Sequence, residues 1–191
     1  PSDCIDFRNR LQIELLRPRS TSSRIKMITK PIRVSYGFAV RTSTKTQISM
    51  TTNLPRGLRN NNPLNIRINP GNNWQGKVKN NTDGQFEQFT SMSFGIRAAF
   101  KIIHNWLREG RPFIETPADI ICRWAPPKEN NTTLYIDKVE YIAKLNMKAR
   151  IKWADKDRIV RLVHAMAIVE CGAAYKDQLS IDTFSKCYDL A

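Results

Sequence analysis

The sequence predicts an α+β protein that is mainly α-helical, with one small β-hairpin ahead of four helices. Apolar residues recur at helical spacing in several segments after residue 90, whereas polar and apolar residues alternate only between residues 74 and 89. An apolar fraction of 41% in 191 residues is enough for one hydrophobic core of moderate size. The pattern therefore favours a small helical domain with a minor β element.

The first 50 residues differ from the rest, because they carry ten basic and only three acidic residues and show no sustained periodicity. We expect an irregular basic segment over 1–50, a folded domain over 51–175 and a C-terminal tail over 176–191 that is loose or forms a short helix. The basic segment is interpreted as a linker, as the end of something longer or as a translated upstream region. A nucleic-acid-binding arm is the functional alternative.

The hairpin is expected between residues 74 and 89. Trp74–Val78 alternates apolar and polar side chains, Asn80–Gly84 is rich in turn formers, and Gln85–Phe89 resumes an extended pattern.

Four helices follow, each with recognisable start or stop signals. The first is expected over 94–107, with Ser91 or Ser93 as N-cap and Gly110 as stop. The second is expected over 116–124, because Thr, Pro and Asp follow the order typical of a helix start. The third begins after residue 131 or 132, and the fourth spans 155–171 with Gly172 at its end. Trp106, on the first helix, is expected to lie in the hydrophobic core.

The formal net charge of +14 predicts a polyanionic partner, such as nucleic acid, an anionic cell wall or a membrane surface. No stretch approaches the ~18 consecutive apolar residues of a membrane-spanning helix. The four cysteines lie far apart and only two histidines are present, so we expect neither a metal site nor a cofactor.

The densest polar cluster runs from Arg56 to Arg67, with four asparagines and three arginines in twelve residues. Asn side chains donate and accept hydrogen bonds, and Arg presents a planar fork of donors. This inventory suits a polymer rich in hydroxyl, acetamido and carboxylate groups, which describes peptidoglycan well and a phosphate backbone less well. The alternative is that the asparagines only hold an irregular loop together through hydrogen bonds within it.

A second motif spans residues 123–135, where Glu129 follows Trp124, Pro126 and Pro127. An apolar wall beside a carboxyl favours its protonated form, as the general acid of a glycosidase requires. Asp83 is the candidate second carboxylate, although an Asp-Gly pair is also ordinary turn chemistry. Glu129 has the alternative of capping the next helix.

Other acids have weaker claims. Glu87 is expected to be a solvated strand residue. Glu170, at the end of the fourth helix, is expected either to lie against the site or to face solvent. The predicted catalytic residues are therefore Glu129 and Asp83. The predicted substrate-binding residues are the amide, guanidinium and aromatic side chains of the two motifs and of the hairpin: Asn60, Asn62, Asn65, Arg67, Trp74, Trp124, Asn130 and Tyr135.

Four blocks in order carry a family resemblance: RGLRNNNPLNIR, NWQGK, TDGQFEQFTSMSFGIRAAF and ICRWAPPKENNTTLYIDKV. Together with AMAIVECG they make residues 53–172 similar to a family of phages and Bacteroidetes prophages, whose members are described as virion structural or lysozyme-like proteins. The resemblance implies a lysozyme-like fold and carries Asp83 and the pair Glu129-Asn130 over to this chain. Lysozyme-like enzymes usually place an acid before the hairpin, and no carboxylate lies between Leu54 and Thr82 here.

The resemblance implies an enzyme that cleaves the glycan strand of peptidoglycan, as a muramidase or a lytic transglycosylase. One alternative is a non-catalytic virion protein that binds cell wall or capsid partners, and another is a nucleic-acid-binding protein. The implied locations are the virion, or the bacterial cytoplasm before release, with action at the cell wall.

Overall fold

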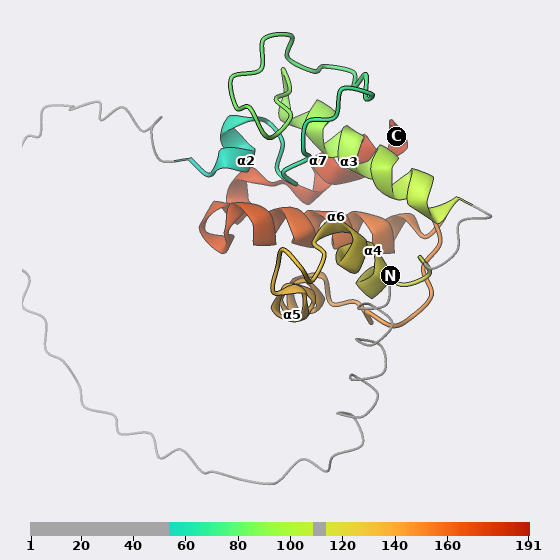
Figure 1. Ribbon diagram of the computed structural model, residues 1–191. Coiled ribbons are helices and arrows are strands. Elements are labelled where there is room, and N and C mark those ends of the chain that lie inside the picture. The colour runs from blue at the N-terminus through green and yellow to red at the C-terminus, as the bar shows by residue number, and fades with distance from the viewer. Residues whose placement is uncertain (1–53, 109–113) are drawn as a thin grey trace, which may run out of the picture. The chain divides into compact units, whose positions relative to one another are not determined.

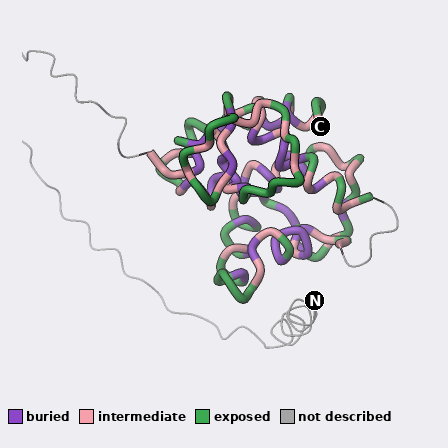
Figure 2. The backbone as a smooth tube through the Cα atoms, turned by 45° about the horizontal axis from the view of Figure 1, so that its top comes forward, coloured by how far each residue is buried: buried purple, intermediate pink, exposed green. Residues whose placement is uncertain are grey.

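Helix α6 (Lys156–Cys171) lies at the centre of the fold, with α5 (Thr132–Ala143) and α7 (Ile181–Asp189) packed against it (Figure 1). The computed structural model describes residues 54–108 and 114–191, so the predicted basic segment over 1–50 lies outside the described residues. The described part is mainly helical, as predicted. Figure 2 shows the buried residues gathered in its interior.

The centre of the core is the apolar surface of α6. Ile159, Leu162, Val163 and Met166 are fully buried, and α6 buries residues on nearly all sides of its axis. A helix that is apolar around most of its circumference must be covered by several partners. Here α2 (Arg56–Arg59), α5, α7 and the 3₁₀ helix η2 (Ala173–Gln178) supply that cover.

Helix α3 (Met92–Leu107) begins two residues earlier than predicted, with Ser91 at the N-cap position. Gly95 in its first turns lies against the loop that contains Asn61, and a Cβ atom there would stand 2.0 Å from the Asn61 carbonyl oxygen. Any larger residue would push α3 away from this loop. Gly110, the predicted stop, lies outside the described residues.

Helices α4 (Pro117–Trp124) and α5 begin as predicted. The Thr116 Oγ1 accepts a hydrogen bond from the Asp119 amide at 3.2 Å, and the Asp119 Oδ2 accepts one from the Thr116 amide at 3.0 Å. At α5, the Asn131 Oδ1 accepts from the Leu134 amide at 3.1 Å. Both helix starts therefore follow from local capping chemistry.

The C-terminal segment, predicted as a loose tail or short helix, belongs to the core. Phe184 of α7 is fully buried, and α7 packs against α3 and α6. Trp153 strengthens the contact between α3 and α7. Its ring centre lies 4.3 Å from that of His104 of α3 and 4.4 Å from that of Tyr188 of α7, and both pairs of rings are stacked. These contacts join residues far apart in the chain, so local sequence patterns did not reveal this packing.

The predicted β-hairpin is present only as isolated antiparallel bridges. One bridge joins Lys77 to Phe89, and a second joins Arg67 to Phe86. The return segment of the expected hairpin thus divides its pairing between two partners. Neither pairing extends into a ladder, so the described residues form irregular structure here.

Within the described residues, no helix combines the length and apolar character needed to cross a bilayer.

Replacing Phe184 by Ala should lower the free energy of unfolding by about 3–5 kcal/mol, because it leaves a cavity beneath α7. Denaturant unfolding followed by circular dichroism measures this change. The matched control is Ile181→Ala in the same helix, where the side chain is 44% exposed and the expected cost is about 0.5 kcal/mol or less. Equal losses in the two variants would mean that α7 is not part of the core.

Candidate functional site

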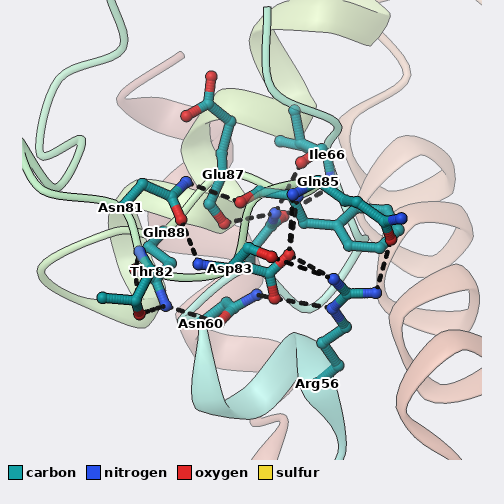
Figure 3. Close-up of polar contacts among 11 residues, drawn as sticks. Arg56, Asn60, Ile66, Asn81, Thr82, Asp83, Gln85, Glu87 and Gln88 are labelled. Carbon is teal, nitrogen blue, oxygen red and sulfur yellow. Dashed lines mark hydrogen bonds and ion pairs between the residues drawn. The ribbon is translucent and has the colours of Figure 1, made fainter.

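Arg56 and Asp83 form the polar centre of the region between α2 and α3 (Figure 3). The Arg56 Nε and Nη2 donate to the Asp83 carboxylate at 2.7 and 2.6 Å. The Asn60 amide nitrogen donates to the same carboxylate at 2.8 Å, and the backbone amides of Gln85 and Phe86 donate at 3.2 and 2.9 Å. The protein therefore supplies the carboxylate with a complete set of donors.

These contacts determine the charge state of Asp83. The hydrogen-bonded Arg56 guanidinium holds the pKa of this carboxyl well below its usual range, although burial acts in the opposite direction. Asn60 and the two backbone amides lower the pKa further. The Asp83 carboxylate is ionised and 7% exposed, and its hydrogen bonds organise the turn that contains it. A turn was the alternative interpretation of the Asp-Gly pair.

Asn60 and Asn62, two of the predicted substrate-binding residues, have structural partners as well. The Asn60 Oδ1 accepts from Gln88 at 3.0 Å. The buried Asn62 donates to the carbonyl oxygens of Ile66 and Glu87 at 3.0 and 2.9 Å and accepts from the Ile66 amide at 2.9 Å. These side chains replace the backbone pairing that a regular sheet would have provided.

A surface groove of about 390 Å³ lies beside this framework. Its wall combines a polar loop with one face of α3 and the end of α4: Asn65, Ile66, Arg67, Ile68, Asn69, Pro70, Asn72, Ile102, Trp106, Arg123 and Trp124. The structure therefore brings three predicted substrate-binding residues, Asn65, Arg67 and Trp124, to one site.

The aromatic part of the groove is held in a defined arrangement. Trp106 and Trp124 meet edge to face at 5.8 Å, and the Arg123 guanidinium lies 5.0 Å from the Trp106 ring centre. The Trp124 Nε1 donates to the Leu64 carbonyl oxygen at 3.2 Å, which fixes the indole. Trp106 was expected in the core, but it is half-buried because it lines this groove.

Glu129 lies at the rim. Its Oε2 accepts from the Arg67 Nη2 at 2.8 Å, and the two side chains are 55% and 74% exposed. The apolar wall expected around this carboxyl is therefore absent. Asn130 is exposed, with a contact to the Pro126 carbonyl oxygen, and neither it nor Trp74 belongs to the groove lining.

Glu170 of α6 contacts Asn65, which lines the groove. The Asn65 Nδ2 donates to the Glu170 Oε2 at 2.8 Å, and the hydroxyl of Tyr135, the remaining predicted residue, donates to Oε1 at 3.1 Å. Burial raises the pKa of Glu170, although these two hydrogen bonds act against the increase. Burial also raises the pKa of Tyr135 well above its usual value and that of Cys171 to about 12, with Glu170 adding to both.

The sequence left Glu170 undecided between the site and solvent. Its one signal was a lone acid at the end of an apolar helix, which does not distinguish these two positions. Only the packing of α6 against α2 and α5 places it beside Asn65.

Glu87 is buried, contrary to the solvated strand position expected for it. Its side chain is 0% exposed and its Oε1 accepts from Lys77 at 2.9 Å, while its Oε2 has no hydrogen-bond partner. Within the described residues, no three His, Cys, Asp or Glu side chains are grouped as a metal site.

No protein-family model matches the chain. Protein P5 of Pseudoalteromonas phage PM2 is 44% identical to it over 87 residues, which is 44% of this chain and 52% of that protein. The chain thus spans about half the length of the phage protein that it matches. This likeness confirms the phage part of the predicted resemblance, whereas its lysozyme-like and Bacteroidetes parts stay predictions.

Replacing Asp83 by Asn should lower the free energy of unfolding near neutral pH by about 1–3 kcal/mol, because the donors around it lose a charged acceptor. The lowered folded-state pKa means that this stabilisation is present above the pKa of an unfolded Asp. It is lost as the pH falls towards the folded-state value. Denaturant unfolding at several pH values should therefore show the parent losing stability in acid more steeply than Asp83→Asn.

The matched control is Asp157→Asn, which removes a 79% exposed carboxylate paired with Arg161. This change should alter stability by about 0.5 kcal/mol or less. The structural role of Asp83 would be refuted by an Asp83→Asn variant that is as stable as this control.

Proposed function

We propose that this protein is a phage virion component that binds the glycan strand of peptidoglycan in the groove between the Asn65 loop, α3 and α4. The observation that carries the proposal is the composition of this groove. Two Trp, two Arg and three Asn residues line one cavity of about 390 Å³. The likeness of the chain to a phage protein supports a place in the virion.

Each type of side chain matches a part of the polymer. The indole rings of Trp106 and Trp124 offer apolar faces on which sugar rings stack. The guanidinium groups of Arg67 and Arg123 match the carboxylates of the lactyl and peptide substituents. The side chains of Asn69 and Asn72 match acetamido and hydroxyl groups, since an amide donates and accepts.

The overall charge supports the same partner. A net charge of +14 attracts the protein to an anionic wall and raises its rate of encounter with it. The exposed Arg67 is paired with Glu129, and this ion pair is exchangeable because both side chains are solvated. A carboxylate of the polymer therefore has access to Arg67.

Glycan cleavage by Glu129 and Asp83, the predicted pair, receives less support. Asp83 is ionised and surrounded by donors from its own chain, so it has no capacity left to activate water. Glu129 is 55% exposed and paired with Arg67, so it lacks the apolar surroundings expected of a general acid. Binding is therefore the activity proposed for the groove.

The test is co-sedimentation of the full chain with purified sacculi. Trp124→Ala and Arg67→Ala should each weaken binding about tenfold or more if these side chains are central contacts. Arg67 is 74% exposed, so its replacement leaves the fold intact. Circular dichroism checks the fold of Trp124→Ala.

The matched controls are Tyr141→Ala and Lys148→Ala, an exposed aromatic residue and an exposed cation outside the groove lining. Both should bind as the parent does. A folded parent that stays in the supernatant would refute the proposal. Losses as large in the controls would refute the groove as the site, and binding to DNA in its place, steeply weakened by salt, would favour the nucleic-acid alternative.

A further inference from the structure

Glu170 has a half-buried side chain and lies beside the groove. It is the next-to-last residue of α6 and is half-buried, so part of its side chain stays accessible. Asn65 lines the groove and donates to the Glu170 Oε2 at 2.8 Å. The carboxyl is therefore separated from the groove wall by a single hydrogen bond.

Two elements hold this carboxyl in one orientation. Tyr135 of α5 donates to its Oε1 at 3.1 Å, and the Asn65 Nδ2 donates to its Oε2 at 2.8 Å. The Asn65 backbone adopts the left-handed conformation at φ 51°, and its amide donates to the Asn62 carbonyl oxygen at 3.0 Å. Neither partner carries a charge, so these hydrogen bonds favour the ionised carboxylate less than the Arg56 guanidinium does at Asp83.

We propose that Glu170 is the general acid that cleaves the glycan strand bound in the groove. This inference rests on the proposed function, because it requires a sugar chain at the Asn65 end of the groove. Burial favours the protonated form of a carboxylic acid, and a protonated carboxyl can deliver its proton to a leaving oxygen. The raised pKa of Glu170 agrees with this role.

The reaction balances with one acid. The Glu170 proton passes to the glycosidic oxygen as the C1–O bond breaks, and the departing chain leaves as a free hydroxyl. The resulting carboxylate then takes a proton either from water or from the C6 hydroxyl of the same sugar as that oxygen bonds to C1. The first course gives a reducing end and the second a 1,6-anhydro end, and both restore the acid.

The other carboxylates of this region lack one of these properties. Asp83 is ionised by its donors, and Glu129 is exposed and paired with Arg67. Glu87 is fully buried and paired with Lys77, so a polymer has no access to it. Glu170 differs from these three because its side chain is half-buried and both of its carboxyl oxygens accept hydrogen bonds from uncharged groups, one of them on a residue that lines the groove.

The test measures cleavage and binding on the same proteins. Purified sacculi are incubated with the full chain and with its Glu170→Gln variant, and released muropeptides are analysed by mass spectrometry. Gln keeps the shape of Glu, and its single oxygen can accept from the Asn65 Nδ2 while its Nε2 donates to the Tyr135 hydroxyl oxygen. We expect release to fall by about 10²-fold or more while co-sedimentation with sacculi stays unchanged.

Two further variants sharpen the result. Glu140→Gln makes the same chemical change at an exposed position of α5 and should release muropeptides at the parental rate. Glu129→Gln tests the rival acid: loss of release there, with Glu170→Gln still active, would overturn the inference. The same holds if Glu170→Gln binds and cleaves like the parent.

The outcomes separate the two proposals. A parent that binds sacculi without releasing muropeptides overturns the role of Glu170 and leaves the binding function standing. A parent that neither binds nor cleaves overturns both.

Discussion

The bidentate ion pair between Arg56 and Asp83 is the interaction on which the candidate site depends. It joins the short helix α2 to a turn 27 residues further along the chain, and Asn60 and two backbone amides complete the shell around the carboxylate. The region between them has isolated bridges in place of strands, so side chains must hold it together. A buried polar network of this kind stabilises only when every member is satisfied, which Asp83 achieves.

The polar cluster from Arg56 to Arg67 divides its work between framework and groove. Asn60 and Asn62 face inward and replace backbone pairing, whereas Asn65 and Arg67 emerge at the groove. The two interpretations of the cluster, ligand binding and loop connection, are therefore compatible, because different residues serve each. A rigid loop is also what a binding surface needs, since ordering it in advance lowers the entropic cost of binding.

Carboxylates in this fold have different surroundings because they pack against different neighbours. Asp83 meets a guanidinium and stays ionised, Glu170 meets an amide and a phenol and has a raised pKa, and Glu129 is solvated beside Arg67. Spacing along the chain reveals none of this. It depends on which elements pack against each side chain and on how much water they exclude.

The sequence by itself determined four of the helices and the starts of α4, α5 and α6. The capping box of Thr116 and Asp119, the Asn131 cap and the apolar face of α6 all act within a few residues, so local pattern was sufficient. Only the tertiary structure decided that α7 is core, that the hairpin reduces to bridges, and that Glu170 stands beside Asn65, 105 residues away along the chain. Contacts between such distant residues arise from the packing of whole elements, and no local propensity encodes them.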